Sequence, residues 1–267
     1  MRLKFENFTL RAVGFLLAAF LVFPVLALFV ASAPRELLLG LQHPLVWPAL
    51  RLSLLTTTTT TLVVVFLGTP LAWSLAQSKR KGIQFIETLL QLPLVIPPSV
   101  AGIAMLLAFG NRGLLSALLH PAGNSLAFTT TAVIMAQVFV SAPLFIQSAS
   151  SAFRRIDAKL VVVAQTFGAL PWSVFFRVAL PLALPGLAAG AAVSWSRALG
   201  EFGATLMFAG NLEGKTQTLP LAIYTAFTSD IRAAQAISII LVLVAFALLL
   251  LMRVFMKKAE RKFDGMP

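Results

Sequence analysis

Long apolar stretches separated by short polar segments dominate the chain. Each is close to the 20 residues that a helix needs to cross the roughly 30 Å hydrocarbon core of a bilayer. The pattern therefore predicts an all-α integral membrane protein with six transmembrane helices, N- and C-termini on the same side. The expected spans lie at about residues 12–32, 50–76, 85–109, 129–150, 182–209 and 233–256.

Composition supports a membrane protein, because 59% of the residues are hydrophobic and only 11% are charged, with a mean hydropathy of +0.92. Soluble domains carry about 25% charged and 45–50% apolar residues, so the soluble class is excluded. No long polar linker or low-complexity tail interrupts the spans. We expect residues 1–267 to form a single transmembrane domain, with no room for an ATPase.

The basic residues give the orientation. In a soluble chain, the net charge of +12 could indicate nucleic-acid binding, but here 15 of the 21 Lys and Arg residues fall on one side of the expected spans, five fall on the other, and Arg197 lies within a span. By the positive-inside rule the richer side is cytoplasmic. We therefore expect cytoplasmic termini in a multi-pass plasma (inner) membrane protein, with lipid around it and no nucleic-acid partner. The inner residues are Arg2, Lys4, Arg11, Lys79, Arg80, Lys81, Arg154, Arg155, Lys159, Arg177, Arg253, Lys257, Lys258, Arg261 and Lys262, and the outer ones are Arg35, Arg51, Arg112, Lys215 and Arg232.

The first span has a second interpretation. Basic residues, an apolar run and Ala31-Ser32-Ala33 are also typical of a signal peptide with its cleavage site. The apolar run, about 20 residues, exceeds the 7 to 15 of a signal peptide, which favours a retained span. Cleavage would leave five spans with the same topology.

Few residues in the chain suit catalysis or metal binding. The absence of cysteine excludes disulfides, thiolate metal sites and cysteine nucleophiles, and the two histidines, His43 and His120, stand far apart in sequence. Residues 210–216 resemble a phosphate-binding loop, but three residues separate the two glycines where that motif needs four. We expect no catalytic residue, no metal and no bound nucleotide in this chain.

The longest inner loop, about residues 151–181, is not simply polar. Apolar residues recur in it at helical spacing and are followed by Gly168, which predicts a short amphipathic helix that ends in a glycine turn. From the pattern alone, this helix either lies in the lipid headgroup region or docks onto a cytoplasmic partner. The apolar positions are Leu160, Val163, Ala164 and Phe167.

Two segments of this loop, Ala164–Ala169 and Val178–Pro181, resemble the EAA motif of permease subunits of binding-protein-dependent ABC importers. In that family the motif forms a coupling helix that sits in a cleft of the ATP-binding subunit. Val162 stands where the family usually has a glutamate, which removes one expected polar contact. The resemblance implies that the ATPase contacts are Val162, Val163, Ala164, Gln165, Thr166, Phe167, Gly168, Ala169, Leu180 and Pro181.

Other segments resemble the molybdate permease subfamily, and the resemblance extends over about residues 50–255. They are Leu92–Gly102, Gly110–Gly113, Arg197–Thr205 and Gly210–Tyr224. The resemblance implies a type I ABC importer permease fold and import of molybdate or tungstate. It also implies a second copy of the chain, two cytoplasmic ATPase subunits that carry ATP and Mg²⁺, and an extracytoplasmic oxyanion-binding protein, with no cofactor in the chain itself.

Two alternatives stay open. Sulfate or thiosulfate permeases share the general pattern of these segments. An ATP-independent secondary transporter of anions would also contain intramembrane charges and proline-broken helices. Such a transporter has no reason to carry an EAA-like loop, so the loop favours the ATP-driven importer.

Arg197 and Glu201 are charged residues within the fifth expected span. Each costs about 2.5–3.5 kcal/mol at a bilayer centre on insertion scales, so such residues normally face the bundle interior or a water-filled cavity. Their i,i+4 spacing places them on one helix face, where they can pair. They either form a pair that stabilises the fold or line an anion pathway, with Arg197 supplying positive potential and Glu201 holding its orientation.

Three further patterns bear on helix packing. The six threonines Thr56–Thr61 cover every face of a helical turn, so we expect their hydroxyls to bond to carbonyls of the preceding turn. Prolines at positions 70, 93, 97 and 98 predict kinks in the second and third spans. Gly186 and Gly190 form a small-residue face for close packing, either within the chain or near a symmetry axis.

Overall fold

The computed structural model describes residues 2–32, 34–78, 80–116 and 125–264. Lys79 and His120 lie outside these residues, and so do the side chains of Arg2, Lys4, Arg253 and residues 255–264. Every regular element in the described part of the chain is a helix, which confirms the all-α prediction.

Among the described residues, five helical stretches are long and apolar enough to cross a membrane, or six if a bent helix pair counts as one span. One of them, Pro171–Leu199, is continuous through α10 (Pro171–Val174), the π-helical turn η1 (Phe175–Ala179) and α11 (Leu180–Leu199). The other four belong to α1 (Arg2–Val30), α3 (Val46–Gln77), α8 (Thr130–Arg154) and α14 (Ile231–Asp264).

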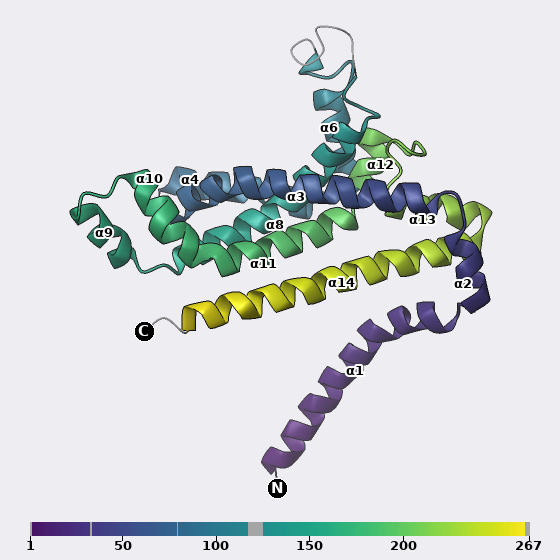
Figure 1. The fold of residues 1–267 in the computed structure, drawn as a ribbon, viewed down its shortest axis with the longest axis horizontal. Coiled ribbons are helices and arrows are strands. Elements are labelled where there is room, and N and C mark those ends of the chain that lie inside the picture. The colour runs from purple at the N-terminus through teal and green to yellow at the C-terminus, as the bar shows by residue number, and fades with distance from the viewer. Residues whose placement is uncertain (1, 33, 79, 117–124, 265–267) are drawn as a thin grey trace.

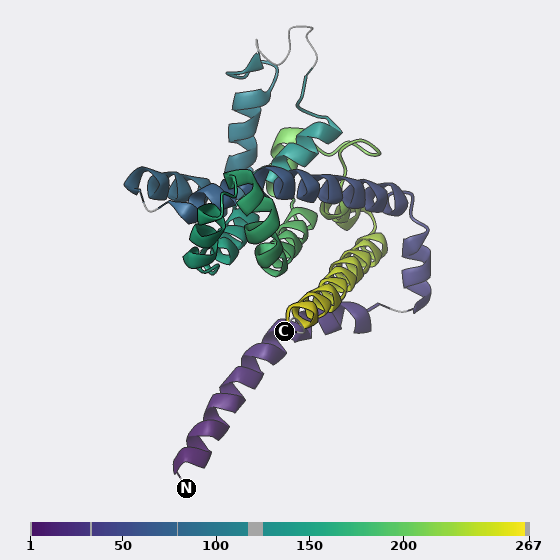
Figure 2. The same cartoon turned by 60° about the vertical axis from the view of Figure 1, so that its left-hand side comes forward.

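The bent pair lies where one span was expected at 85–109. Helices α4 (Lys81–Leu90) and α5 (Leu92–Val95) precede α6 (Pro98–Phe109), and the chain turns by 113° between the two parts. Ile96 and Pro97 are extended there, because a residue before proline avoids the helical region and neither proline has an N–H to donate. In Figures 1 and 2, α6 points away from the main bundle, so the segment is a broken span or a re-entrant loop.

Helix α3 responds differently to its proline. It continues as one helix through Pro70, and the Thr69 hydroxyl donates to the Val65 carbonyl at 2.6 Å. Every proline lacks an N–H and disfavours the helical conformation of the residue before it. At 97 and 98 these effects fall on successive residues, whereas Pro70 stands alone within α3.

The span expected at 182–209 is divided as well. Helix α11 ends at Leu199, and residues 200–202 separate it from a short helix, α12 (Gly203–Ala209). Apolarity continues across the break, so the hydropathy pattern does not reveal it.

Helices α3, α8 and α11 lie side by side and share a buried core around Phe145, Phe153 and Leu187. A Cβ at Gly190 would stand 2.9 Å from Ser148 Cβ on α8, and one at Gly186 would clash with Ala152. The small-residue face on α11 therefore packs within the chain, against α8.

Helix α14 packs against α2 (Pro34–Leu41) and α13 (Leu219–Ser229). Its Ala233 and Ile237 share a second buried core with Val46 of α3 and Leu219 of α13. Toward its N-terminus helix α1 extends away from the bundle in Figure 1, and its few contacts are mainly with α14. No residue of its apolar stretch Val13–Val30 is buried.

The expected threonine bonds are mostly local. Thr57 donates to Ser53 O at 2.7 Å and Thr61 to Thr57 O at 2.9 Å, one turn back in each case. Thr60 instead donates to the side chain of Gln137 on α8 at 3.0 Å. Both ends of that bond are buried, so it joins the two helices inside the core.

Candidate functional site

Two regions of the structure carry the residues singled out by sequence. The first is the end of the bundle at which α9 (Ala158–Thr166) projects between α8 and α10, here called the α9 end (Figure 1). The second is the break between α11 and α12, which lies toward the other end of α11.

Helix α9 has a defined cap at each end. The Asp157 side chain accepts a hydrogen bond from the Lys159 N–H at 2.9 Å, which is an N-cap interaction. At the other end Gly168 adopts φ +83° and donates to Gln165 O, while Ala169 donates to Ala164 O. This pair of bonds is the Schellman arrangement, which needs a residue in the left-handed region and so favours glycine.

No residue of α9 is buried. Val162 and Val163 are exposed on the helix, and Phe167, at its end, is 88% exposed. Leu170 and Trp172 continue the apolar surface into the following turn and α10. An apolar surface of this kind on a projecting helix typically marks a site for another protein or for membrane.

The predicted EAA-like residues separate into two groups. Val162 through Thr166 lie on α9, Phe167 through Ala169 form its terminal turn, and Leu180 and Pro181 begin α11. The Thr166 hydroxyl donates to the carbonyls of Val162 and Val163 at 2.9 and 2.8 Å. This hydroxyl is therefore already occupied within the helix.

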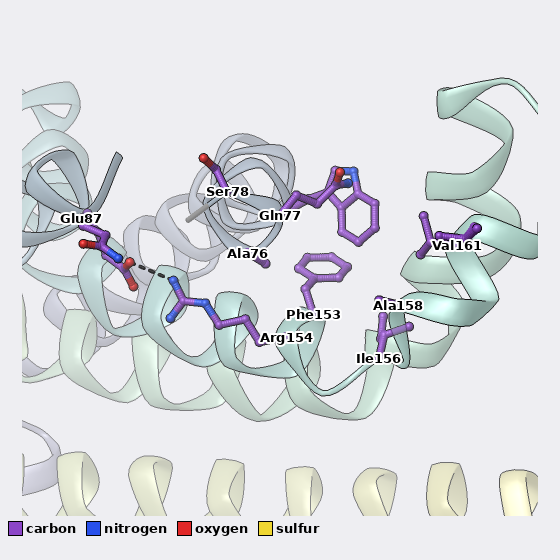
Figure 3. A pocket seen from close by; sticks show the side chains of 12 residues that line it. Ala76, Gln77, Ser78, Glu87, Phe153, Arg154, Ile156, Ala158 and Val161 are labelled. Carbon is purple, nitrogen blue, oxygen red and sulfur yellow. Dashed lines mark hydrogen bonds and ion pairs between the residues drawn. The ribbon is translucent and has the colours of Figure 1, made fainter. Parts of the chain in front are cut away.

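An open cavity of about 690 Å³ separates α9 from the bundle. Figure 3 shows Ala158 and Val161 of α9 on one side of it, and Glu87 and Arg154 on the other. The Arg154 Nη2 atom lies 2.7 Å from Glu87 Oε2, so this ion pair joins the end of α8 to α4. Both partners are partly exposed.

An aromatic cluster holds the two segments that flank α9. Trp73 of α3 lies 5.2 Å from Phe153 of α8 and 5.8 Å from Phe175 of η1, measured between ring centroids. Phe153 and Phe175 are 6.2 Å apart. Since α8 precedes α9 and η1 follows it, the cluster ties both attachments of α9 to α3.

At the second region Arg197 and Glu201 do pair. Arg197 Nη1 lies 2.7 Å from Glu201 Oε2, across the end of α11. The other oxygen, Oε1, accepts the backbone N–H of Ala204 at 2.8 Å, in the first turn of α12. One buried carboxylate thus bridges the two helices on either side of the break.

The comparisons with known proteins give the family. Residues 68–265 match the family described as binding-protein-dependent transport system inner membrane component. This chain belongs to that family.

Relatives within it cover most of the chain. The molybdenum transport system permease protein ModB of Mycobacterium tuberculosis is 48% identical over 197 residues, which are 74% of this chain and 75% of that one. The ModB protein of Escherichia coli K12 is 35% identical over 82% of this chain and 96% of its own length. The molybdate/tungstate transport system permease protein WtpB of Thermococcus kodakarensis is 33% identical over 95% and 97%.

Solved structures agree on the fold. A crystal structure of a bacterial ABC transporter that imports alginate matches with a TM-score of 0.75 at 17% identity, covering 97% of this chain and 99% of that one. The MetNI methionine ABC transporter, in inward-facing conformations, matches with a TM-score of 0.63 at 15% identity, covering 80% and 96%. This confirms the importer permease fold.

The sequence did not predict the aromatic cluster or the Arg154–Glu87 pair, although both lie beside α9. Trp73, Phe153 and Phe175 belong to three helices far apart in sequence, and no local pattern links them. The one available signal was the gathering of aromatic residues at 172–176, directly after the predicted helix.

Proposed function

We propose that this chain is the membrane permease subunit of an ATP-driven, binding-protein-dependent importer of molybdate or tungstate. The observation that carries the proposal is the similarity to permeases named for molybdenum, molybdate or tungstate transport, which extends to 95% of this chain. Family membership supports a transport subunit, with ATP hydrolysis on a separate partner chain that binds ATP and Mg²⁺.

The ATPase would dock at the α9 end. An exposed apolar helix with a rigid glycine turn is a suitable part to enter a cleft of a partner, because little of its shape changes on binding. The excess of basic residues on this side of the expected spans supports a cytoplasmic α9 and cytoplasmic termini. The soluble oxyanion-binding protein would dock at the opposite end.

A complete importer would contain two copies of this chain, two ATPase subunits and one binding protein. Two-fold association places the same surface of each copy at the interface, so an anion path between copies is built from one sequence. ATP binding would close the ATPase pair, move both α9 helices and open the path outward, and hydrolysis would reset it. Force from α9 would reach α3, α8 and α11 through Trp73, Phe153 and Phe175, which contact one another.

Uptake by proteoliposomes tests the proposal. With the cognate ATPase and binding protein, ATP-dependent accumulation should respond to molybdate or tungstate in roughly the nanomolar to micromolar range of tight binding. Omitting the ATPase or the binding protein in turn should abolish it. Efficient uptake of sulfate, with no uptake of molybdate, would contradict the proposed substrate. Uptake without ATP would contradict an ATP-driven importer.

A further inference from the structure

The Arg197–Glu201 ion pair has two unequal ends. The Glu201 side chain is 1% exposed, whereas that of Arg197 is 32% exposed. Glu201 uses both oxygens inside the protein, one toward Arg197 and one on the Ala204 N–H. The end of the pair that reaches open space is therefore the positive one.

The guanidinium of Arg197 has N–H groups to spare. Within the described part of the chain its one polar partner is Glu201, and Oε2 of that carboxylate accepts no aligned hydrogen bond despite the 2.7 Å separation. A guanidinium carries five N–H donors in a planar fork that matches the oxygens of tetrahedral anions. Donors at the level of a bilayer need acceptors, since hydrocarbon offers none.

The surroundings of the pair are also suited to an anion. Gly200 is exposed beside it at the break between α11 and α12. The first turn of α6 meets the same place, because a Cβ at Gly203 would stand 2.9 Å from Pro98 and 3.2 Å from the Ser99 nitrogen. Helix α6 has 12 residues, and the positive end of its dipole points to this meeting of two broken spans.

We propose that the exposed edge of Arg197 is a transit contact for a tetrahedral oxyanion within the membrane domain. Glu201 is a positioning residue that holds the guanidinium and the start of α12, and it does not meet the anion. Far from the pair, the potentials of the two charges cancel. Close to the exposed guanidinium the potential is positive, because Arg197 is nearer than Glu201. The inference rests on the proposed function for the identity of the anion as the imported substrate.

The cysteine-free chain allows a direct test by charge-selective labelling. A side chain at Gly200 has room, since the nearest atom to a Cβ there is Ser196 O at 3.8 Å. The assembled complex of the Gly200→Cys variant, without ATP, is reacted with an anionic and with a cationic methanethiosulfonate. The ratio of the anionic to the cationic reaction rate is then divided by the same ratio for a free thiol in solution. A local potential of about one kT gives roughly a sevenfold preference for the anionic reagent, because the two reagent charges differ by two.

The comparison variant removes both charges at once. Arg197→Gln with Glu201→Gln leaves two neutral side chains and no stranded charge, and the preference for the anionic reagent at Gly200→Cys should fall to near one. Gly82→Cys is the matched control, since Gly82 is exposed on α4 with nothing within 4 Å of a Cβ. Its ratio should be the same with and without the double substitution.

The positioning role of Glu201 is tested by the direction in which protection by molybdate changes when Glu201 is substituted. In the absence of binding protein, molybdate should protect Gly200→Cys from the anionic reagent. Removing a negative charge by Glu201→Gln should strengthen protection if only net charge matters. If Glu201 positions the guanidinium, the molybdate concentration that gives half protection should rise severalfold in Glu201→Gln. A fall in that concentration would overturn the positioning role.

The outcomes separate this inference from the proposed function. The transit contact is overturned if the preference for the anionic reagent survives the double substitution, or if the Gly200→Cys variant reacts with neither reagent. Either result does so even if ATP-driven uptake works. Protection by sulfate and not by molybdate changes the substrate and leaves the contact in place.

Discussion

The α9 end and the α11–α12 break differ in where their polar and apolar groups face. At α9 large apolar side chains are exposed, the Asp157 side chain caps the helix, and the Thr166 hydroxyl donates to carbonyls of the preceding turn. At the break an acidic group is buried and only its basic partner reaches the surface. The first arrangement suits contact with a protein surface, and the second suits contact with an anion.

The largest loss of stability is expected from substitution in the Arg197–Glu201 pair, because its two side chains are unequally exposed. Arg197→Gln leaves the buried Glu201 carboxylate without its counter-charge, which typically costs about 3–5 kcal/mol. Glu201→Gln leaves a partly exposed guanidinium and should cost clearly less. Thermal unfolding of the purified variants in detergent measures the order, and a larger loss for Glu201→Gln would contradict the assigned exposure.

At the α9 end, Gly168→Asp should weaken ATPase binding by about 2 kcal/mol or more, a roughly 30-fold change, because it places charge and bulk at a proposed contact. Gly214→Asp is the matched control. Gly214 also has positive φ, at +70°, and nothing within 4 Å of a Cβ, but it lies in the loop between α12 and α13. Copurification of the ATPase should be lost for Gly168→Asp alone, and equal retention would remove the coupling role from α9.

The aromatic cluster should contribute less. Trp73→Leu keeps an apolar side chain but removes two ring pairs, each typically worth about 0.5–1.5 kcal/mol. Trp47→Leu on the same helix is the control, since Trp47 is exposed. Trp73→Leu should lower both the unfolding temperature and the uptake per bound ATPase, and a loss no greater than that of the control would argue against the cluster.

The smallest effect is expected from the ion pair between α4 and α8. Both Glu87 and Arg154 are partly exposed, and such pairs contribute about 0.2–1 kcal/mol. Glu87→Gln should therefore lower stability slightly at low salt and not at high salt, where screening already weakens the pair. Denaturation at two ionic strengths measures this, and a salt-independent loss would indicate a packing role instead.

Short-range features were the most predictable from sequence. The turn at Gly168 and the i,i+4 pairing of Arg197 with Glu201 depend on residues within one or two helical turns. The prolines at 97 and 98 predicted a kink, but not its 113° angle, which depends on how α6 packs against α12.

Features that join distant segments were not predictable. Apolar residues continue on both sides of the break before Gly203, so hydropathy does not reveal it. The hydrogen bond from the Ala204 N–H to Glu201 at the break is local, but the approach of Pro98 to Gly203 joins segments far apart in sequence. The unequal burial of Arg197 and Glu201 is likewise set by neighbouring helices. Local spacing gives the pair but not the end that is exposed.

The most direct test of a division between an ATPase-contacting end and an anion-contacting end is uptake by the double swap Arg197→Glu with Glu201→Arg. The swap keeps the i,i+4 spacing of the pair and reverses which charge is exposed, because the positive charge moves from the last turn of α11 to the buried position 201 in the break before α12. Normalised to the assembled complex, we expect unchanged ATPase binding and loss of most molybdate uptake. Near-normal uptake would mean that the pair only stabilises the fold, and would contradict an anion contact at Arg197.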